Sequence, residues 1–152
     1  MVSPVRLDVN CKIMHKVKAC VVGCIDFRFR DHEDEFLKHQ EWGDSYDLIT
    51  IAGGSRDFIS PVEEIDGKYV WKQLKLSVDL HDPEVIVFVD HQDCGGYAQD
   101  GTIPNGLEFA KDEEEHAKFF KQLKEKLQES YPSKQYKFFF AGLDGVVEEV
   151  EV

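Results

Sequence analysis

The chain has 152 residues, of which 42% are apolar and 32% are charged, a balance typical of a water-soluble globular protein. Its formal net charge of −12 disfavours a nucleic-acid partner and an anionic membrane surface, because both carry negative charge. No apolar run reaches the roughly 18 residues that a membrane span needs, and the first residues lack the apolar core of a signal peptide.

The length predicts one domain over residues 1–152, with residues 1–16 as an N-terminal arm. The cysteines are few for a disulfide scaffold of this length: Cys11, Cys20, Cys24 and Cys94. We expect a cytoplasmic protein, in which thiols are more often reduced, bound to metal or catalytic than cross-linked.

Strand and helix patterns alternate along the chain. Apolar, β-branched runs predict strands at residues 17–23, 46–54, 84–90, 136–142 and 146–152. Apolar residues at spacings of three and four predict helices at residues 31–42, 68–81 and 106–131. The last strand alternates only partly between apolar and polar residues, which suits the edge of a sheet. The segment 53–67 is expected to be an irregular surface loop with a helical turn.

Particular residues predict where the three expected helices begin or end and which of their side chains face the core. Asp31 is expected to cap the first helix, and Asp82-Pro83 to end the second. The side chains expected to face inward from the first two helices are Phe36, Leu37, Trp42, Val70, Leu74, Val78 and Leu80. Those expected from the third helix are His116, Phe119, Phe120, Leu123 and Leu127.

The alternation of strands and helices predicts a three-layer α/β fold. We expect a mainly parallel sheet of about four strands in the order 2-1-3-4, with one C-terminal edge strand and helices on both faces. In such a sheet, ligands bind beyond the carboxyl ends of the strands, where the strand order reverses. Strands one and three are neighbours at that point.

Two groups of reactive side chains follow strands one and three. Cys24, Asp26 and Arg28 are spaced by two residues, so in an extended segment they share one face. His91 and Cys94 follow the third strand. Because the carboxyl ends of parallel strands meet at one edge of a sheet, we expect Cys24 to lie next to His91 and Cys94.

These side chains suit a zinc ion. Two thiolates and an imidazole are three of the four ligands of a tetrahedral zinc site, and three protein ligands leave one position for water. Asp26 has two alternative roles: it closes the site as a fourth ligand, or it pairs with Arg28 and leaves the metal open. Gly95 and Gly96 would let the backbone approach closely and present N–H groups to an oxyanion.

The remaining cysteines and histidines favour structural roles. Cys20 favours a core position in its strand, although it shares a strand face with Cys24 and so offers an alternative metal pair. Structural or solvent-exposed positions are expected for Cys11, His15, His32, His39, His81 and His116.

At these residues the sequence resembles the β-class carbonic anhydrases. That family has a Cys-x-Asp-x-Arg motif after its first strand and a His-x-x-Cys-Gly motif after its third, which correspond to residues 24–28 and 91–95. The strand ending in Ala52-Gly53-Gly54 and the closing FFFAGLDG stretch are also similar. The resemblance therefore extends over most of the chain.

The resemblance implies a zinc enzyme that hydrates CO2 reversibly to bicarbonate by a metal-bound hydroxide. Cys24, His91 and Cys94 would bind zinc. Asp26 and Arg28 would form the dyad that keeps the metal open. The resemblance also implies a homodimer or a higher homo-oligomer.

Two departures from the family pattern leave alternatives open. Ile25 and Phe27 are bulky where the family usually has small residues, and Thr50-Ile51 stands where an Arg-Asn pair is common. Phe27, which is expected to line an apolar pocket with Tyr97, favours a related hydrolase of a linear substrate such as carbon disulfide or carbonyl sulfide. The missing Arg-Asn pair favours a zinc-binding regulatory protein without turnover.

Overall fold

The computed structural model describes residues 15–152. Cys11, and all but the last two residues of the expected arm at residues 1–16, lie outside the described residues.

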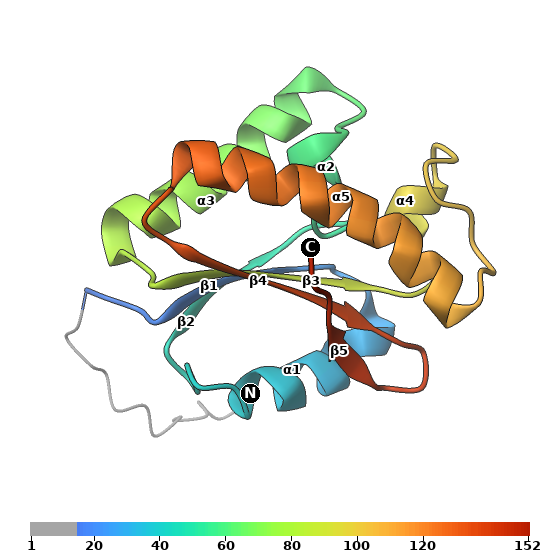
Figure 1. Ribbon diagram of the computed structural model, residues 1–152, viewed down its shortest axis with the longest axis horizontal. Helices are drawn as coiled ribbons and strands as arrows, with labels where there is room; N and C mark the ends of the chain where they lie inside the picture. Colours follow the sequence, from blue (N-terminus) through green and yellow to red (C-terminus); the bar gives the residue numbers. More distant parts are fainter. Residues whose placement is uncertain (1–14) are drawn as a thin grey trace, which may run out of the picture.

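A five-stranded sheet forms the centre of the described chain (Figure 1), in the order β2-β1-β3-β4-β5. The strands are β1 (Ala19–Gly23), β2 (Tyr46–Thr50), β3 (Val85–His91), β4 (Gln135–Ala141) and β5 (Val147–Glu149). The first four run parallel, and β5 pairs with β4 in the antiparallel direction. The predicted strand order and the C-terminal edge strand are confirmed.

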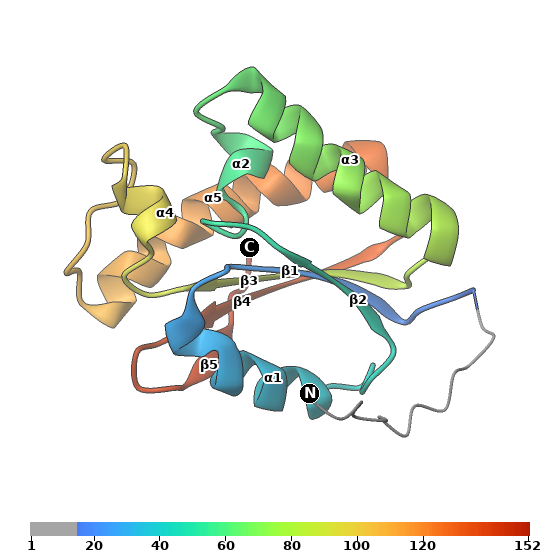
Figure 2. The same cartoon turned by 180° about the vertical axis from the view of Figure 1, so that it is seen from behind.

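Helices cover both faces of the sheet, as predicted. The two opposite views show helices on both sides of the sheet (Figures 1 and 2). The helices are η1 (Phe27–Phe29), α1 (Arg30–Lys38), α2 (Arg56–Ile59), α3 (Glu64–His81), α4 (Gly95–Ala98) and α5 (Phe109–Ser130). α1 covers the first face, α2, α3 and α5 cover the second, and the short η1 and α4 follow the ends of β1 and β3.

Two apolar cores result from the alternation of side chains along the strands. Even-numbered residues of the central strands, such as Cys20 and Ile86, pack with α2, α3 and α5. Odd-numbered residues, such as Val21 and Val87, pack with Leu37 of α1. Because helices cover both faces, β3 is buried over its whole length.

The start of α1 differs from the prediction. The helix begins at Arg30 with Phe29 as its N-cap, so the predicted Asp31 cap is wrong, and Asp31 lies in the first turn. The physical reason is the preceding 3-10 turn, which Asp26 caps by accepting a hydrogen bond from the backbone N–H of Arg28 at 3.0 Å. Trp42 lies beyond the helix end but is buried, as expected of it.

The segment 53–67 has the predicted helical turn, which is α2, but it is not the irregular surface loop predicted around that turn. It contains α2 and the first turn of α3, and its first four residues are buried. Two hydrogen bonds fix this course: Ser55 N–H donates to Asp90 Oδ1 at 2.9 Å, and Glu63 N–H donates to Asp66 Oδ2 at 3.4 Å at the start of α3. The second helix therefore begins four residues before the predicted position.

The end of α3 agrees with the prediction. Asp82 adopts the left-handed conformation at φ 48° and ends the helix, with Pro83 directly after it. The inward position expected for Leu80 is wrong, because this side chain is 62% exposed. Val70 and Leu74 are buried as predicted.

Candidate metal centre

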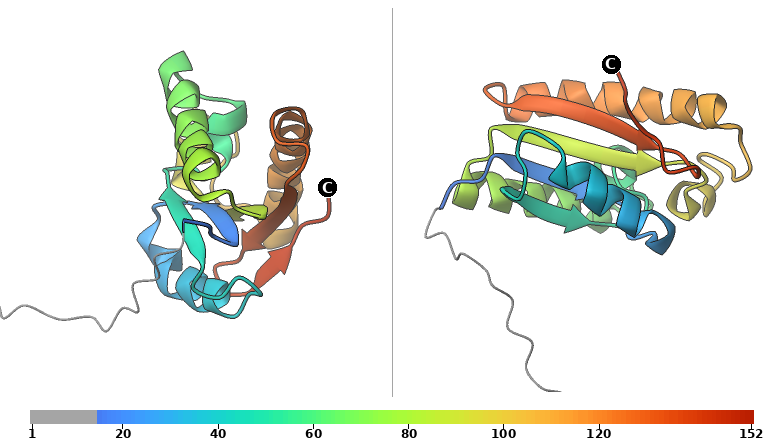
Figure 3. Two further views of the ribbon diagram at one scale, coloured as in Figure 1. Left: turned by 90° about the vertical axis from the view of Figure 1, so that its left-hand side faces the viewer. Right: turned by 90° about the horizontal axis from the view of Figure 1, so that it is seen from below.

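The carboxyl ends of β1 and β3 lie side by side. In the register of these parallel strands, Gly23 pairs with Val89. Cys24 is the first residue after β1, His91 is the last residue of β3, and Cys94 caps the short α4. Figure 3 shows that the parallel strands end at the same edge of the sheet.

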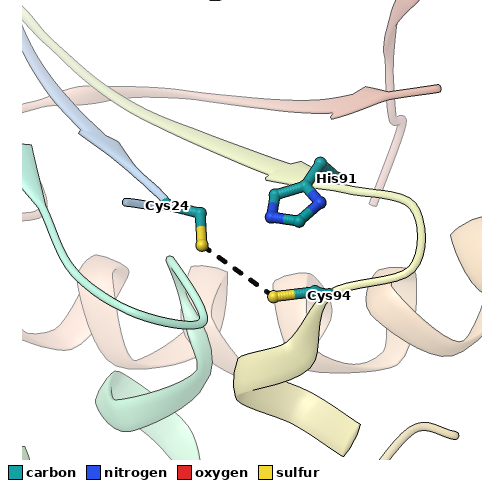
Figure 4. A group of neighbouring side chains, drawn as sticks. All are labelled: Cys24, His91 and Cys94. Atoms are coloured by element: carbon teal, nitrogen blue, oxygen red, sulfur yellow. Dashed lines mark hydrogen bonds between the residues drawn. The ribbon is translucent and has the colours of Figure 1, made fainter. Parts of the chain in front are cut away.

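The structure brings the three predicted ligand atoms together (Figure 4). The sulfurs of Cys24 and Cys94 are 3.9 Å apart, and both sulfurs and one His91 ring nitrogen lie within 4.8 Å of one another. A tetrahedral zinc ion with Zn–S bonds of about 2.3 Å would separate its two sulfurs by about 3.8 Å. All three residues are buried. The geometry therefore fits a small, tetrahedral divalent cation.

The imidazole of His91 is oriented as a ligand. Its Nδ1 donates to the backbone carbonyl of Gln92 at 2.8 Å, which leaves the lone pair on Nε2. Nε2 is buried and has no hydrogen-bond partner among residues 15–152. The Phe29 ring stacks on the imidazole at 4.1 Å between centroids and fixes its plane. A buried, unpartnered lone pair that faces two sulfurs is the observation that best fits a metal.

The contact between the two sulfurs shifts the pKa values of the two thiols in opposite directions. The contact with the Cys94 thiol holds the pKa of Cys24 well below its usual range, and the same contact with burial raises the pKa of Cys94. The backbone N–H of Gly53 also donates to the Cys24 sulfur at 3.4 Å and stabilises the thiolate. A divalent cation would displace the remaining thiol proton and neutralise both thiolates.

Asp26 pairs with Arg28 beside the cluster. Nη2 of Arg28 donates to Asp26 Oδ2 at 2.7 Å, and Nε lies 3.1 Å from each carboxylate oxygen. The hydrogen bond from Arg28 lowers the pKa of Asp26, so the carboxylate is ionised at neutral pH. Asp26 Oδ2 is also 3.9 Å from His91 Nε2, so the same oxygen lies close to the cluster.

A pocket of about 360 Å³ opens beside the cluster and is lined by residues that include Cys24, the Asp26–Arg28 pair, Gly95 and Gly96. Phe27 is 85% exposed and lies at this pocket with Ile25. The predicted close approach applies to Gly96, where an added Cβ would lie 2.5 Å from the Gly53 nitrogen. It does not apply to Gly95, around which a Cβ would meet nothing within 4 Å.

Tyr97 does not line the pocket, contrary to the sequence-based expectation. Its side chain is completely buried. The hydroxyl donates to Asp90 at 3.1 Å and lies 2.8 Å from the hydroxyl of Ser55. The reason is that Tyr97 sits on the inner side of α4, where buried polar groups below the pocket bind its hydroxyl.

The remaining cysteine and the other histidines among residues 15–152 do not join the cluster. Cys20 packs in the core between the sheet and α3, and it is not part of the one metal-compatible group found among residues 15–152. His32 is exposed on α1, His39 is exposed directly after that helix, and His81 bonds to Asp47 through Nδ1 at 2.8 Å. His116 is buried and faces the core.

Three acidic residues near the site were not identified from the sequence. Asp90 is buried beneath the pocket, Asp93 contacts Arg28, and Glu33 is buried on α1 close to Gly23. Only Asp93 carried a usable signal, because it lies inside the His-x-x-Cys motif. Asp90 and Glu33 required knowledge of which face each element buries.

The comparisons with known proteins agree with this geometry. The family model described as "Putative carbonic anhydrase" matches residues 14–151. An uncharacterized protein of Rickettsia bellii is 26% identical over 141 residues, which cover 93% of this chain and 86% of that protein. None of the helices described over residues 15–152 is both long and apolar enough to cross a membrane.

Two solved structures share the fold. A tetrameric β-carbonic anhydrase from Sordaria macrospora has a TM-score of 0.58 at 14% identity, covering 91% of this chain and 82% of that one. The apo form of a carbon disulfide hydrolase has a TM-score of 0.51 at 14% identity, covering 90% of this chain and 79% of that one. With the strand order, the two motifs and the family match taken together, the chain belongs to the β-class carbonic anhydrase family.

Proposed function

We propose that this protein is a zinc enzyme that hydrates CO2 reversibly to bicarbonate. The observation that carries the proposal is the convergence of two sulfurs and the unpartnered Nε2 of His91 beside an acid–arginine pair. Zinc bound by Cys24, His91 and Cys94 would lower the pKa of a water molecule towards about 7 and so supply a nucleophile at neutral pH.

Asp26 and Arg28 have separate tasks in this proposal. Asp26 accepts a proton or a hydrogen bond through Oδ2, the oxygen that lies 3.9 Å from His91 Nε2. Arg28 keeps Asp26 ionised and oriented by hydrogen bonds to both of its oxygens. Ile25 and Phe27 provide an apolar wall for a nonpolar substrate, and Gly95 and Gly96 border the space for an anionic product.

The test is stopped-flow CO2 hydration on protein of known zinc content. We expect about one zinc per chain and turnover that falls about 10²-fold or more in Asp26→Ala, because a positioned proton acceptor contributes about 10²–10⁴-fold. Asp79→Asn is the matched control, since Asp79 is on α3 and pairs with the exposed Lys75. One zinc per chain without hydration at any pH would reject the proposed reaction, and the same result with the related substrates below would favour a zinc-binding regulatory protein.

A second substrate class follows from the pocket and the comparisons. One structural neighbour is a carbon disulfide hydrolase, and the exposed Phe27 would narrow access to a linear molecule. Carbon disulfide and carbonyl sulfide should be assayed on the same zinc-loaded sample. A higher kcat/KM for either of them than for CO2 would replace the proposed reaction while leaving the metal site unchanged.

We propose that the protein assembles as a homo-oligomer through α3. Four large apolar side chains of this helix are exposed: Ile65, Tyr69, Leu76 and Leu80. At about 100° per residue they fall within a stripe of about 60° along the helix. The Sordaria macrospora neighbour is tetrameric, so a second copy of this chain is the proposed occupant. Tyr69→Glu should lower the molar mass measured by light scattering, and an unchanged mass would exclude this face.

We also propose a reducing, cytoplasmic environment. Cys24 and Cys94 are reduced and their sulfurs are 3.9 Å apart. A disulfide needs a separation of about 2.05 Å, so a small movement would allow oxidation to consume two of the three ligands. A reducing compartment preserves the site.

A further inference from the structure

Arg28 is held on both edges of its guanidinium group. One edge faces Asp26, through Nε and Nη2. The other edge faces Asp93, because Nη1 donates to Asp93 Oδ2 at 3.1 Å and Nη2 donates to the backbone carbonyl of Asp93 at 2.9 Å. Arg28 therefore bridges the chain after β1 and the chain after β3, and its pairing with Asp26 is not the only contact that fixes it.

Asp93 is itself fixed by residues that come later in the chain. Its other oxygen, Oδ1, accepts hydrogen bonds from Asn105 Nδ2 at 2.8 Å and from the backbone N–H of Gly106 at 3.0 Å. Its own backbone N–H donates at 2.8 Å to Asp112, which is buried in the first turn of α5. Asp93 has φ +59°, a left-handed conformation that aspartate adopts more readily than most residues. These contacts present Oδ2 to Arg28 from a fixed support.

Asp26 has a competing position available. Its Oδ2 is 3.9 Å from His91 Nε2, so a small rotation would bring it to a cation held by the three ligands. A carboxylate there would complete a set of four protein ligands and leave no exchangeable position. Arg28 opposes this movement only while it stays in place, and its side chain is 36% exposed with several rotatable bonds. The contacts with Asp93 remove that freedom.

We propose that Asp93 is a positioning residue: by fixing the far edge of Arg28, it keeps Asp26 paired with Arg28 and the fourth coordination position of the metal open. The inference rests on the proposed metal site and deepens the proposed function, because Asp93 touches neither the metal nor the substrate. Simple electrostatics predicts the opposite effect on anion binding, since removing a negative charge near the site would raise its affinity for an anion.

The experiment uses the full chain loaded with Co²⁺ and titrated with thiocyanate, followed by visible absorption. Asp93→Asn tolerates the left-handed conformation but has one acceptor oxygen, which cannot serve both Arg28 and the Asn105–Gly106 pair. Asp93→Gly also tolerates it and removes the carboxylate. We expect thiocyanate affinity to fall about tenfold in the Asn variant and further in the Gly variant, because the closed state gains population. Asp79→Asn, with its exposed partner, should keep the parent affinity.

Asp93→Asn in an Asp26→Ala background distinguishes loss of the positioning of Asp26 from a general distortion of the metal site. With the competing carboxylate gone, Asp93→Asn should no longer lower thiocyanate affinity. An equal loss in both backgrounds, or an unchanged or raised affinity in Asp93→Asn alone, would overturn the proposal.

These readouts do not depend on turnover. If the parent hydrates no CO2 while the cobalt and thiocyanate results hold, the proposed function fails and the role of Asp93 stands. If the parent binds no cobalt, both fail.

Discussion

Asp90 and His91 are neighbours on β3, but their side chains point to opposite faces of the sheet and meet opposite conditions. The Asp90 carboxylate accepts hydrogen bonds from Ser55 N–H at 2.9 Å, Ser55 Oγ at 2.5 Å, Tyr97 OH at 3.1 Å and His116 Nδ1 at 2.9 Å. His91 uses one nitrogen for Gln92 and leaves Nε2 without a partner among the described residues. Both side chains are almost fully buried.

The comparison separates a structural cluster from a binding site. Leaving a buried polar atom without a hydrogen bond costs about 1–3 kcal/mol, so such an atom needs a compensating partner. Around Asp90 the protein supplies every partner of the carboxylate itself, and the one unpartnered nitrogen of its neighbours, His116 Nε2, lies 3.5 Å from Asp112 Oδ1. Around His91 it supplies two sulfurs, one of them a thiolate, and a bound cation would compensate this arrangement.

The largest effect is expected when one of the three candidate metal ligands, Cys24, His91 or Cys94, is removed. We call these residues the unsatisfied cluster. His91→Ala or Cys94→Ser should reduce the metal content from about one equivalent per chain to near none and abolish turnover, because two remaining ligands hold zinc poorly. Elemental analysis of protein expressed with zinc measures this directly. Retention of a full equivalent by either variant would remove the basis of the comparison.

The satisfied cluster consists of Asp90 with Ser55, Tyr97 and His116. Substitutions in it should lower the free energy of unfolding and leave metal binding unchanged. Asp90→Asn places an amide donor among four donors and leaves buried donors without an acceptor, which costs about 1–3 kcal/mol for each such group. Chemical denaturation measures the free energy of unfolding. Tyr97→Phe is the matched control, since it removes one of the four hydrogen bonds and should cost about 1 kcal/mol. Equal losses in the two variants would mean that Asp90 does not organise the cluster.

The sequence allowed the unsatisfied cluster to be predicted, but not the satisfied one. Cys24 and Asp26 lie two residues apart, and His91 and Cys94 three, so local spacing combined with the parallel strand order brought them together. The partners of Asp90 are 7, 26 and 35 residues away, and nothing in their spacing indicates a common face. For the same reason Tyr97 was expected at the pocket and not beneath it.

Glu33 tests whether every unsatisfied buried oxygen indicates a bound ion. It is buried on α1, its Oε2 binds Arg30 at 2.6 Å, and its Oε1 has no partner among residues 15–152. Burial raises its pKa from 4.5 to about 7, so here a proton, and not a metal, compensates the charge below that pH.

The raised pKa of Glu33 determines how its contribution to stability changes with pH. A carboxyl group whose pKa is higher in the folded state contributes stability that is fully present below about 4.5 and is lost as the pH rises through about 7. The free energy of unfolding of Glu33→Gln, relative to that of the parent, should therefore be higher at pH 8 than at pH 5. The expected difference between the two pH values is about 2–3 kcal/mol. Denaturation curves at the two pH values measure it, and a gain that is equal at both would show that Glu33 does not titrate in this range.

The smallest effect is expected for Cys20, which can be compared with the candidate metal ligand Cys24. Cys20 lies on β1, the strand that Cys24 directly follows, but its sulfur packs in the apolar core, and burial raises the pKa of its thiol to about 11. A thiol that keeps its proton at neutral pH is a poor metal ligand. Cys20→Ala should therefore keep the full metal content and lose only about 1 kcal/mol of stability through the small cavity it leaves. A fall in metal content as large as that in Cys94→Ser would contradict this expectation. It would mean that a buried cysteine on β1 takes part in metal binding without facing the unpartnered lone pair of His91.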